Sequence, residues 1–341
     1  MELEKIKIME EKQYYKEKRI SSSSLSYFEQ SPLLFKKFLD SEIERESTRY
    51  LDRGIQIHMA ILEPEEFKKN FTTVNFETPS SAQQKQFCED YINLYDKDFE
   101  DQSSSKTEYD KLILLTAYKN NYKTAGKDEK ILRDAKTLKN KLIKYIEYLQ
   151  KRKTFKDILS WPDWQRISGL KEGIAKHKLA KELLMTDELD TRELHNELVI
   201  FWDDPIHNLP CKSMIDKLVI DHEKKEIILI DLKTANTFKK FRDRCREFNY
   251  FRQLAFYWNA ITWWFLNELK KEIADYTKTT YIIALKTTDD PEVKVIKIDE
   301  PDLMDGWISM QSLIGEIAWH WENDKWDYSR AYYVGDGYDK I

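Results

Sequence analysis

The feature that most constrains this fold is a change in the spacing of apolar residues near residue 195. Up to about residue 190, apolar residues recur three and four positions apart, which is the period of an amphipathic helix. After that point come short runs rich in β-branched residues, bounded by turn-like segments. Strands are therefore expected at 197–202, 213–220, 226–232, 280–285 and 293–298.

Helical signals fill the first half of the chain and return between and after the strands. Ser23 or Ser24 is expected to cap the first helix, and Ser31-Pro32 to begin the second. Further helices are expected at 48–62, 80–98, 106–119, 127–156, 248–269 and 301–321. This order predicts a mixed α/β (α+β) fold, in which a central sheet of about five strands is flanked by helices and preceded by a large helical region.

The sequence contains no internal repeat and no Pro/Gly-rich linker, so a single domain spanning 1–341 is expected. Within it we expect N-terminal helices over 1–75 and a helical insertion over 76–190. The sheet-bearing core then covers 191–300, and a last helix with its tail covers 301–341.

The charge balance and the glycine content exclude several classes of function. The chain has 56 Lys+Arg and 61 Asp+Glu, which gives a net charge of −5. A protein that coats nucleic acid non-specifically needs a large positive excess, although local basic grooves are compatible with this balance. The eight glycines form neither GxxxxGK[ST] nor GxGxxG, so no P-loop, no dinucleotide-binding domain and no nucleotide cofactor are expected.

Cysteine spacing and hydropathy bear on location. Cys88, Cys211 and Cys245 are far apart and odd in number, which argues against a disulfide framework and fits a reducing cytoplasm. The N-terminus is too charged for a signal peptide. The longest apolar run, 254–266, is shorter than the ~20 residues of a spanning helix, so it is expected to be a buried helix and no membrane partner is expected.

The most informative chemistry lies in two neighbouring strands. Asp216 lies within one apolar run, and Asp231 and Lys233 end the next. Because a strand alternates its faces, Asp231 and Lys233 point the same way, with Leu232 buried opposite. The Asp-x-Lys pattern also occurs twice in a charged helical stretch, at 128–130 and 134–136, so it means little alone. A salt bridge at a solvated strand end, worth under ~1 kcal/mol, is the alternative.

Other polar residues on otherwise apolar segments are weak signals one at a time. His58 lies on an amphipathic helix, Glu197 opens the first strand, and Gln253 and Tyr257 lie four apart on the aromatic helix. Each is equally compatible with an ordinary packed or solvated residue. Their joint occurrence, in the order His, Glu, Asp, Asp-x-Lys and Gln-x-x-x-Tyr, is a much more specific pattern.

This set of motifs resembles the RecB-like branch of the PD-(D/E)XK nuclease superfamily. The likeness is strongest to phage and prophage exonucleases of the RecE (exonuclease VIII) and lambda-exonuclease type, and it covers residues ~20 to ~300. It begins with ISSSSLSYFEQSPLLF, continues with GIQIH and ends with MID, IDLKT and FRQLAFY. The resemblance implies a restriction-endonuclease-like core.

The resemblance also implies a metal site. Asp216 and Asp231 would bind divalent metal together with the backbone carbonyl of Leu232. His58 would complete the coordination sphere, and Glu197 would act directly or through water. Oxygen ligands favour Mg²⁺ or Mn²⁺ over zinc, and two ions are expected. Two adjacent carboxylates would repel each other without such a cation.

The remaining motif residues would act on the substrate. Lys233 would orient or help to deprotonate the attacking water and stabilise charge on the phosphorane-like transition state, while Gln253 and Tyr257 would brace the site and contact the substrate backbone. Some RecB-like nucleases hold an iron–sulfur cluster through a cysteine before the early proline and three more near the C-terminus. Here Ser31 precedes the proline and no cysteine follows Cys245, so no such cluster is expected.

Contacts to DNA are predicted from local charge. The basic residues that follow the DLKT motif are candidates for phosphate contacts, namely Lys239, Lys240, Arg242, Arg244 and Arg246. The basic half of the helix at 141–156 is a second candidate, and a solvated basic face is the alternative for both. Ser23 is a candidate for binding a terminal phosphate at a helix N-terminus, with a plain N-cap as the alternative.

Together these features predict a metal-dependent DNA exonuclease. The resemblance implies 5′-to-3′ resection of linear double-stranded DNA for phage-type recombination, a homo-oligomeric ring and a single-strand annealing protein as partner. It also implies a phage or prophage product in the cytoplasm of a bacterial host. A single-strand-specific nuclease or endonuclease in phage defence or DNA processing is the first alternative, and a catalytically silent DNA-binding subunit with the same fold is the second.

Overall fold

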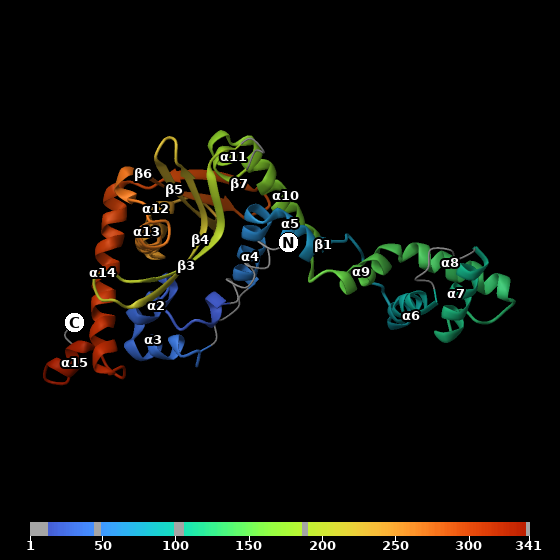
Figure 1. The fold of residues 1–341 in the computed structure, drawn as a ribbon. Coiled ribbons are helices and arrows are strands. Elements are labelled where there is room, and N and C mark those ends of the chain that lie inside the picture. The colour runs from blue at the N-terminus through green and yellow to red at the C-terminus, as the bar shows by residue number, and fades with distance from the viewer. Residues whose placement is uncertain (1–12, 44–48, 99–105, 186–189, 339–341) are drawn as a thin grey trace. The chain divides into compact units, whose positions relative to one another are not determined.

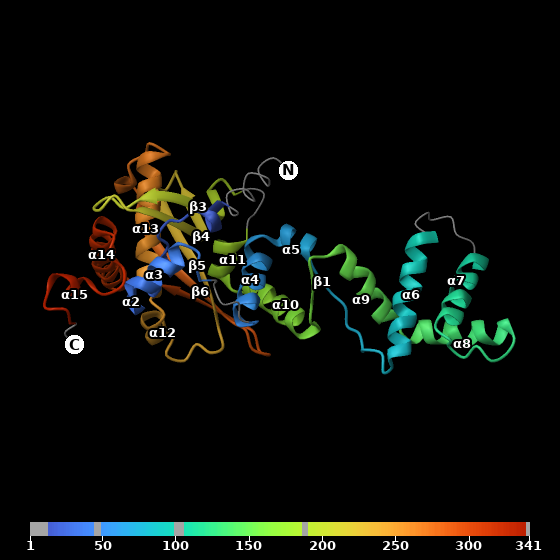
Figure 2. The ribbon, with the colours of Figure 1, turned by 90° about the horizontal axis from the view of Figure 1, so that it is seen from below.

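The computed structural model describes residues 13–43, 49–98, 106–185 and 190–338, which form two compact units (Figures 1 and 2). The sheet unit consists of Met1–Glu63 and Gly169–Ile341, and the helical unit consists of Pro64–Ser168. Each unit contains its own cluster of buried apolar side chains. No helix within the described ranges combines the length and the apolar character that crossing a membrane requires.

The sheet unit is built on a mixed sheet with the strand order β3-β4-β5-β6-β7. The strands are β3 (Glu193–Asp203), β4 (Pro210–Asp221), β5 (Glu226–Ala235), β6 (Thr277–Lys286) and β7 (Glu292–Lys297). β5 and β6 pair in parallel, and every other neighbouring pair is antiparallel. The β-branched runs therefore predicted all five strands correctly, although the first four are longer than expected, and the predicted fold class is confirmed.

Helices cover both sides of this sheet. The helices of the sheet unit are α2 (Ser22–Gln30), α3 (Pro32–Leu39), α4 (Arg49–Leu62), α11 (Lys178–Leu184), α12 (Phe241–Glu247), α13 (Tyr250–Asn267), the short 3-10 helix η1 (Ile273–Asp275), α14 (Glu300–Asn323) and α15 (Arg330–Val334). Figure 1 shows α13 and α14 on one side of the sheet and α4 on the other. α10 (Trp161–Lys176) runs across the boundary between the two units.

The apolar run at 254–266 is the buried centre of α13, as predicted, and this helix packs against β3 and β4. α14 packs against the other side of α13 at very short range. A Cβ atom at Gly306 would lie 2.2 Å from the backbone oxygen of Phe251, so only glycine permits this approach. The buried position of α13 accounts for the long apolar stretch in the sequence.

The start of α2 corrects one expectation. The N-cap is Ser21, not Ser23 or Ser24, and Ser21 and Ser24 form a reciprocal capping box. Four successive serines offer the same local signal, and the extended backbone of Ser21 (φ −120°) decides which one caps. Ser31 caps α3 with Pro32 in its first turn, as expected. The predicted start of α4 at Thr48 lies outside the described residues.

The helical unit consists of α5 (Pro64–Asn70), β1 (Phe71–Thr73), α6 (Ala82–Asp98), α7 (Lys106–Lys119), α8 (Asp128–Lys141), α9 (Ile143–Thr154) and β2 (Asp157–Leu159). The prediction of a single helix at 127–156 is wrong. The helix is interrupted at Leu142 (φ −99°, ψ 14°), which separates α8 from α9. The short parallel pair β1–β2 was not predicted, since three residues are too few to show a period.

Candidate active site

The hydrogen-bonded pairing of β4 with β5 stops beside Asp216. The last paired residues are Lys217 and Ile230, so the next position on each strand is an aspartate, Asp216 on β4 and Asp231 on β5. Oδ2 of Asp216 accepts the backbone N–H of Leu232 at 2.7 Å. The carboxylate therefore takes the place of a backbone acceptor where the ladder ends, and this bond fixes its position.

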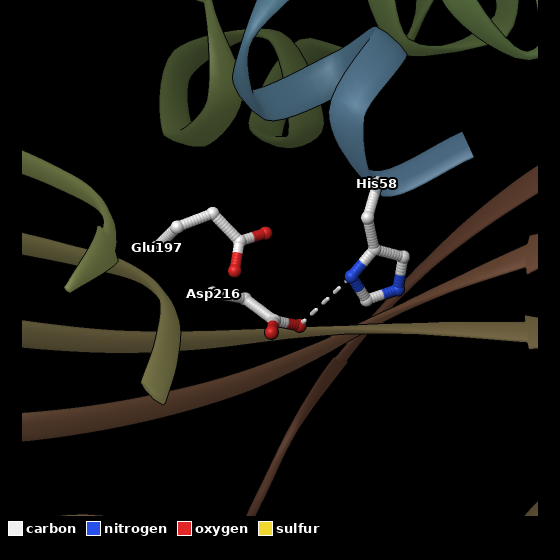
Figure 3. Close-up of side chains that lie close together, drawn as sticks. All are labelled: His58, Glu197 and Asp216. Carbon is white, nitrogen blue, oxygen red and sulfur yellow. Dashed lines mark ion pairs between the residues drawn. The ribbon is translucent and has the colours of Figure 1, made fainter. Parts of the chain in front are cut away.

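The pairing of β3 with β4 is interrupted at the same level. Glu197 has φ 51°, a left-handed conformation that costs a non-glycine residue roughly 1–2 kcal/mol. The residues on either side stay in register, Asn196 with Lys217 and Leu198 with Ile215. Figure 3 shows the Glu197 carboxylate beside that of Asp216. The break in the edge strand thus brings a second acidic side chain to the point where β4 and β5 separate.

α4 adds a histidine to these carboxylates. The helix contacts β4 and β5, and Nδ1 of His58 lies 3.7 Å from Oδ2 of Asp216 (Figure 3). One ligand atom from each of His58, Glu197 and Asp216 lies within 4.8 Å of the other two. An imidazole nitrogen and two carboxylate oxygens at this spacing form a candidate site for a divalent cation.

Asp231 and Lys233 complete the constellation from β5. The Lys233 Nζ lies 2.6 Å from Oδ2 of Asp231, while the intervening Leu232 is fully buried, as strand alternation predicts. Asp231 is only 1% exposed. This pair is therefore a buried ion pair, and the alternative of a solvated salt bridge at a strand end does not apply.

Burial dominates the electrostatics of these groups. It raises the pKa of Asp231 to about 6 against the opposing charge of Lys233, with Asp216 adding to the rise, and it also raises the pKa of Asp216. Burial, helped by the charge of Lys233, lowers the pKa of His58 to about 4. For Lys233 burial acts downward, but the two carboxylates outweigh it and its pKa is raised. At neutral pH His58 is therefore a neutral imidazole with a lone pair to donate.

These residues fit a divalent metal. Oδ1 of Asp231 is buried and accepts no hydrogen bond from any residue that the structure describes. Leaving a carboxylate oxygen desolvated and unpaired is costly, and a cation would remove that cost. The group of His58, Glu197 and Asp216 offers two carboxylates and one imidazole, which suits Mg²⁺ or Mn²⁺, whereas Asp231 is not among the residues whose ligand atoms meet there.

A cavity of about 750 Å³ opens beside these groups. Most of the predicted site residues line it, namely Ser23, His58, Glu197, Asp216, Leu232, Lys233, Gln253 and Tyr257. Asp231 is not part of the wall and reaches the site through its contact with Lys233. Folding thus gathers residues from α2, α4, β3, β4, β5 and α13 around one space.

α13 contributes a row of polar side chains to this wall. Gln253 Nε2 donates to the Tyr257 hydroxyl at 2.8 Å, and burial raises the pKa of Tyr257 well above its usual value. Tyr250 was not predicted as a site residue, yet its ring centroid lies 4.7 Å from the Lys233 Nζ. Residues 250, 253 and 257 are three and four apart, so helical spacing was a signal that could have found it.

A profile described as "PDDEXK-like domain of unknown function (DUF3799)" matches residues 21–330. The chain belongs to this family. The predicted membership of the PD-(D/E)XK superfamily is confirmed at this level, and it supports a nuclease. The finer likeness of the PDDEXK-like chain to RecE-type proteins stays a prediction.

Solved structures and curated sequences give no further support to the PDDEXK-like assignment. The crystal structure of a candidate exonuclease from Eubacterium rectale is 12% identical in sequence and has a TM-score of 0.35. The match covers 88% of this chain and 96% of that one. No curated protein sequence matches the chain.

The five basic residues after the DLKT motif were predicted to contact phosphates. They do not line the cavity of this PDDEXK-like domain. Arg242 and Arg246 both pair with Asp302 of α14, and Arg244 donates to the backbone oxygen of Thr237. Lys239 and Lys240 immediately precede α12. Contact of these five basic residues with DNA stays a prediction, and at least two of them are engaged in holding α12 to α14.

Proposed function

We propose that this PDDEXK-like protein is a metal-dependent deoxyribonuclease that hydrolyses phosphodiester bonds. The observation that carries the proposal is the convergence of His58, Glu197 and Asp216 beside the buried Asp231–Lys233 pair at one cavity. A purely structural salt bridge does not explain why a second aspartate, a strained glutamate and a histidine meet it. A catalytically silent subunit would have no use for the full set.

His58, Glu197 and Asp216 are proposed as metal ligands from this geometry, and Asp231 and the Leu232 carbonyl from the sequence resemblance. His58, Asp216, Asp231 and the Leu232 carbonyl would hold Mg²⁺ or Mn²⁺, with two ions expected, and Glu197 would bind directly or through water. Bound there, the metal supplies a nucleophilic water near neutral pH and a positive charge against the phosphate. The hydrogen bond from the Leu232 N–H holds Asp216 in place for this role.

The other residues act on the substrate. Lys233 lies between the Asp231 carboxylate and the Tyr250 ring, so its ammonium is held close to where a scissile phosphate would enter the cavity. It would orient the attacking water and stabilise the charge that develops on the phosphate. Gln253 and Tyr257, already hydrogen-bonded to each other, would brace the sugar–phosphate backbone, and Ser23 would bind a terminal phosphate.

The finer activity rests on the sequence resemblance. We propose an exonuclease that resects linear duplex DNA from its 5′ ends and hands the 3′ strand to an annealing protein, working as a homo-oligomeric ring. The likeness of the ISSSSLSYF, IDLKT and RQLAFY segments to RecE and lambda-type exonucleases supports this assignment. The same likeness supports a phage or prophage origin and a place in the bacterial cytoplasm.

The test is digestion of matched linear and circular duplexes, each strand labelled at either end, with Mg²⁺ or Mn²⁺. Loss of label from 5′ ends with circles intact is the expected result. Nicked or linearised circles would replace the exonuclease with an endonuclease, and digestion of single strands alone would replace it with a single-strand nuclease. Absence of hydrolysis on every DNA with either metal would leave only the silent subunit.

A further inference from the structure

The helical unit contains a strongly basic segment in a chain that is acidic overall. Residues 119–156 contain 13 Lys+Arg and four Asp+Glu, a net charge of +9, against −5 for the whole chain. The nuclease site described above uses none of these residues. A positively charged segment of this size outside the nuclease site indicates a separate binding function.

Part of this charge lies along one side of α8. Lys130, Arg133 and Lys141 are all exposed and fall three, then eight positions apart, which places them on the same side of a helix. Lys127, exposed at the N-cap, extends the row. We call these four residues the α8 basic face. The part on the helix, from 130 to 141, is ~16 Å long at 1.5 Å per residue.

The acidic residues of the segment neutralise only part of this face, because only Glu129 and Asp134 lie within four residues of its members on the same side of the helix. Glu147 is shared by Lys144 and Lys151, outside the α8 basic face. Asp128 accepts the Tyr118 hydroxyl. Asp134 lies 3.8 Å from Arg133, which is the one member of the face with an ion-pair partner among the described residues. In the part of the chain that the structure describes, Lys127, Lys130 and Lys141 have no ion-pair partner.

The apolar residues of α8 are already used within the unit. Ile131, Ala135 and Leu138 are buried in the cluster that α8 forms with α6, α7 and α9. A helix that binds a membrane surface needs an exposed apolar face beside its charges, and α8 has none to offer. The α8 basic face is therefore suited to a partner that it meets through charge alone.

We propose that the α8 basic face binds the sugar–phosphate backbone of duplex DNA, so that the helical unit holds the substrate while the sheet unit cuts it. This partner rests on the proposed nuclease function. A duplex carries a phosphate charge on each strand about every 3.4 Å along its axis, so a row of ~16 Å faces several phosphates at once. Flexible lysine and arginine side chains contact phosphates without reading the sequence.

The test is binding of a labelled duplex to the full-length protein by fluorescence anisotropy, in EDTA so that nothing is hydrolysed. The test variant replaces Lys127, Lys130, Arg133 and Lys141 with glutamine. The control variant replaces four exposed lysines of the sheet unit with glutamine, Lys178, Lys181, Lys270 and Lys294, so both variants lose the same charge. A third variant with arginine at 127, 130 and 141 keeps the charge, and thermal melting checks that every variant folds.

The expected result is at least a tenfold weaker binding constant for the test variant and a salt dependence whose slope falls by about 4, because each of the four lost phosphate contacts removes about one unit. The control and arginine variants should bind like the wild type. Equal binding by the test and control variants would overturn the α8 assignment while leaving the nuclease function untouched. A wild type that binds through this face and hydrolyses no DNA would overturn the nuclease function instead.

Discussion

The Asp-x-Lys pattern occurs in both units, and its surroundings give it different meanings. On β5, Lys233 pairs with Asp231 two residues away, because strand alternation puts both on one side. On α8, Lys136 pairs with Asp110 of α7 at 2.5 Å, while Asp134 lies near Lys123 and Arg133. In the strand, the Asp-x-Lys pattern forms a buried ion pair between its own two side chains. In the helix, its two side chains pair with different partners.

The two units also differ in charge. The helical unit has 20 Lys+Arg and 17 Asp+Glu, a net +3, which leaves −8 for the sheet unit. In the sheet unit, part of the negative charge is buried at the candidate metal site. The acidic total of the chain therefore says little about a nucleic-acid partner, because metal ions and a separate basic face can meet the phosphates.

The largest expected effect tests the two Asp-x-Lys patterns against each other. Lys233→Ala should lower DNA hydrolysis by about 10²–10³-fold or more, since the ammonium aimed at the developing charge is lost. Asp231→Ala should abolish it. Lys136→Ala, the matched change on α8, should leave the rate unchanged. Initial rates with Mn²⁺ and circular dichroism of each variant provide the measurement, and full activity in folded Lys233→Ala would remove Lys233 from the mechanism.

Metal binding should distinguish the units without any mutation. Mn²⁺ at about 100 times its dissociation constant should stabilise the site by about 2.7 kcal/mol. Hydrogen exchange should therefore slow by up to about 100-fold in α4, β4 and β5, and stay unchanged in α8. Asp216→Ala should remove the effect. Equal slowing in both units would show that the ion binds elsewhere.

Tyr250 offers a smaller and more selective test. Tyr250→Leu removes the ring beside Lys233 and should lower kcat by about 3–30-fold, corresponding to a cation–π contact of about 0.5–2 kcal/mol. Tyr250→Phe keeps the ring and should restore the rate. With a merely structural role, Tyr250→Leu and Tyr250→Phe would have the same kcat. In the helical unit Arg152 lies 5.8 Å from the Tyr148 ring centroid, and Tyr148→Leu should leave kcat unchanged.

The smallest effect concerns pH and the metal-free protein. Asp231 has its pKa raised to about 6, so its contribution to stability is complete below the unfolded value of 3.8 and is lost as pH rises through about 6. Asp231→Asn removes the titrating carboxyl group, so the variant should not lose this stability as the pH rises. Between pH 5 and 7 in EDTA, its free energy of unfolding should gain about 1 kcal/mol relative to the wild type. Denaturant titrations at the two pH values measure it, and a constant difference would contradict the raised pKa.

Local patterns were sufficient for much of the fold. The β-branched runs 213–220 and 226–232 predicted β4 and β5, and Ser31-Pro32 predicted the start of α3. They were not sufficient where several residues offer the same signal, as with the cap at Ser21. They also could not show the break at Leu142, because helical periodicity continues on both sides of it.

The candidate site, like the fold, could be predicted from the sequence only in part. The types of residue and their order along the chain are enough to single out His58, Glu197, Asp216, Asp231 and Lys233. The sequence could not say that Glu197 leaves the strand conformation at φ 51°, or that β4 and β5 separate where the two aspartates stand. Tyr250 was missed because a tyrosine at a helix start is common and only its place over Lys233 is unusual.

By itself, the sequence determined which side chains are available and which secondary structures carry them, because helix and strand periods are local properties. Tertiary structure alone decided that these side chains meet. Burial of Asp231 and Lys233, and the contact of α4 with β4 and β5, depend on packing between segments far apart in the chain. That packing removes water from the carboxylates, and desolvation turns ordinary acidic residues into a candidate metal site.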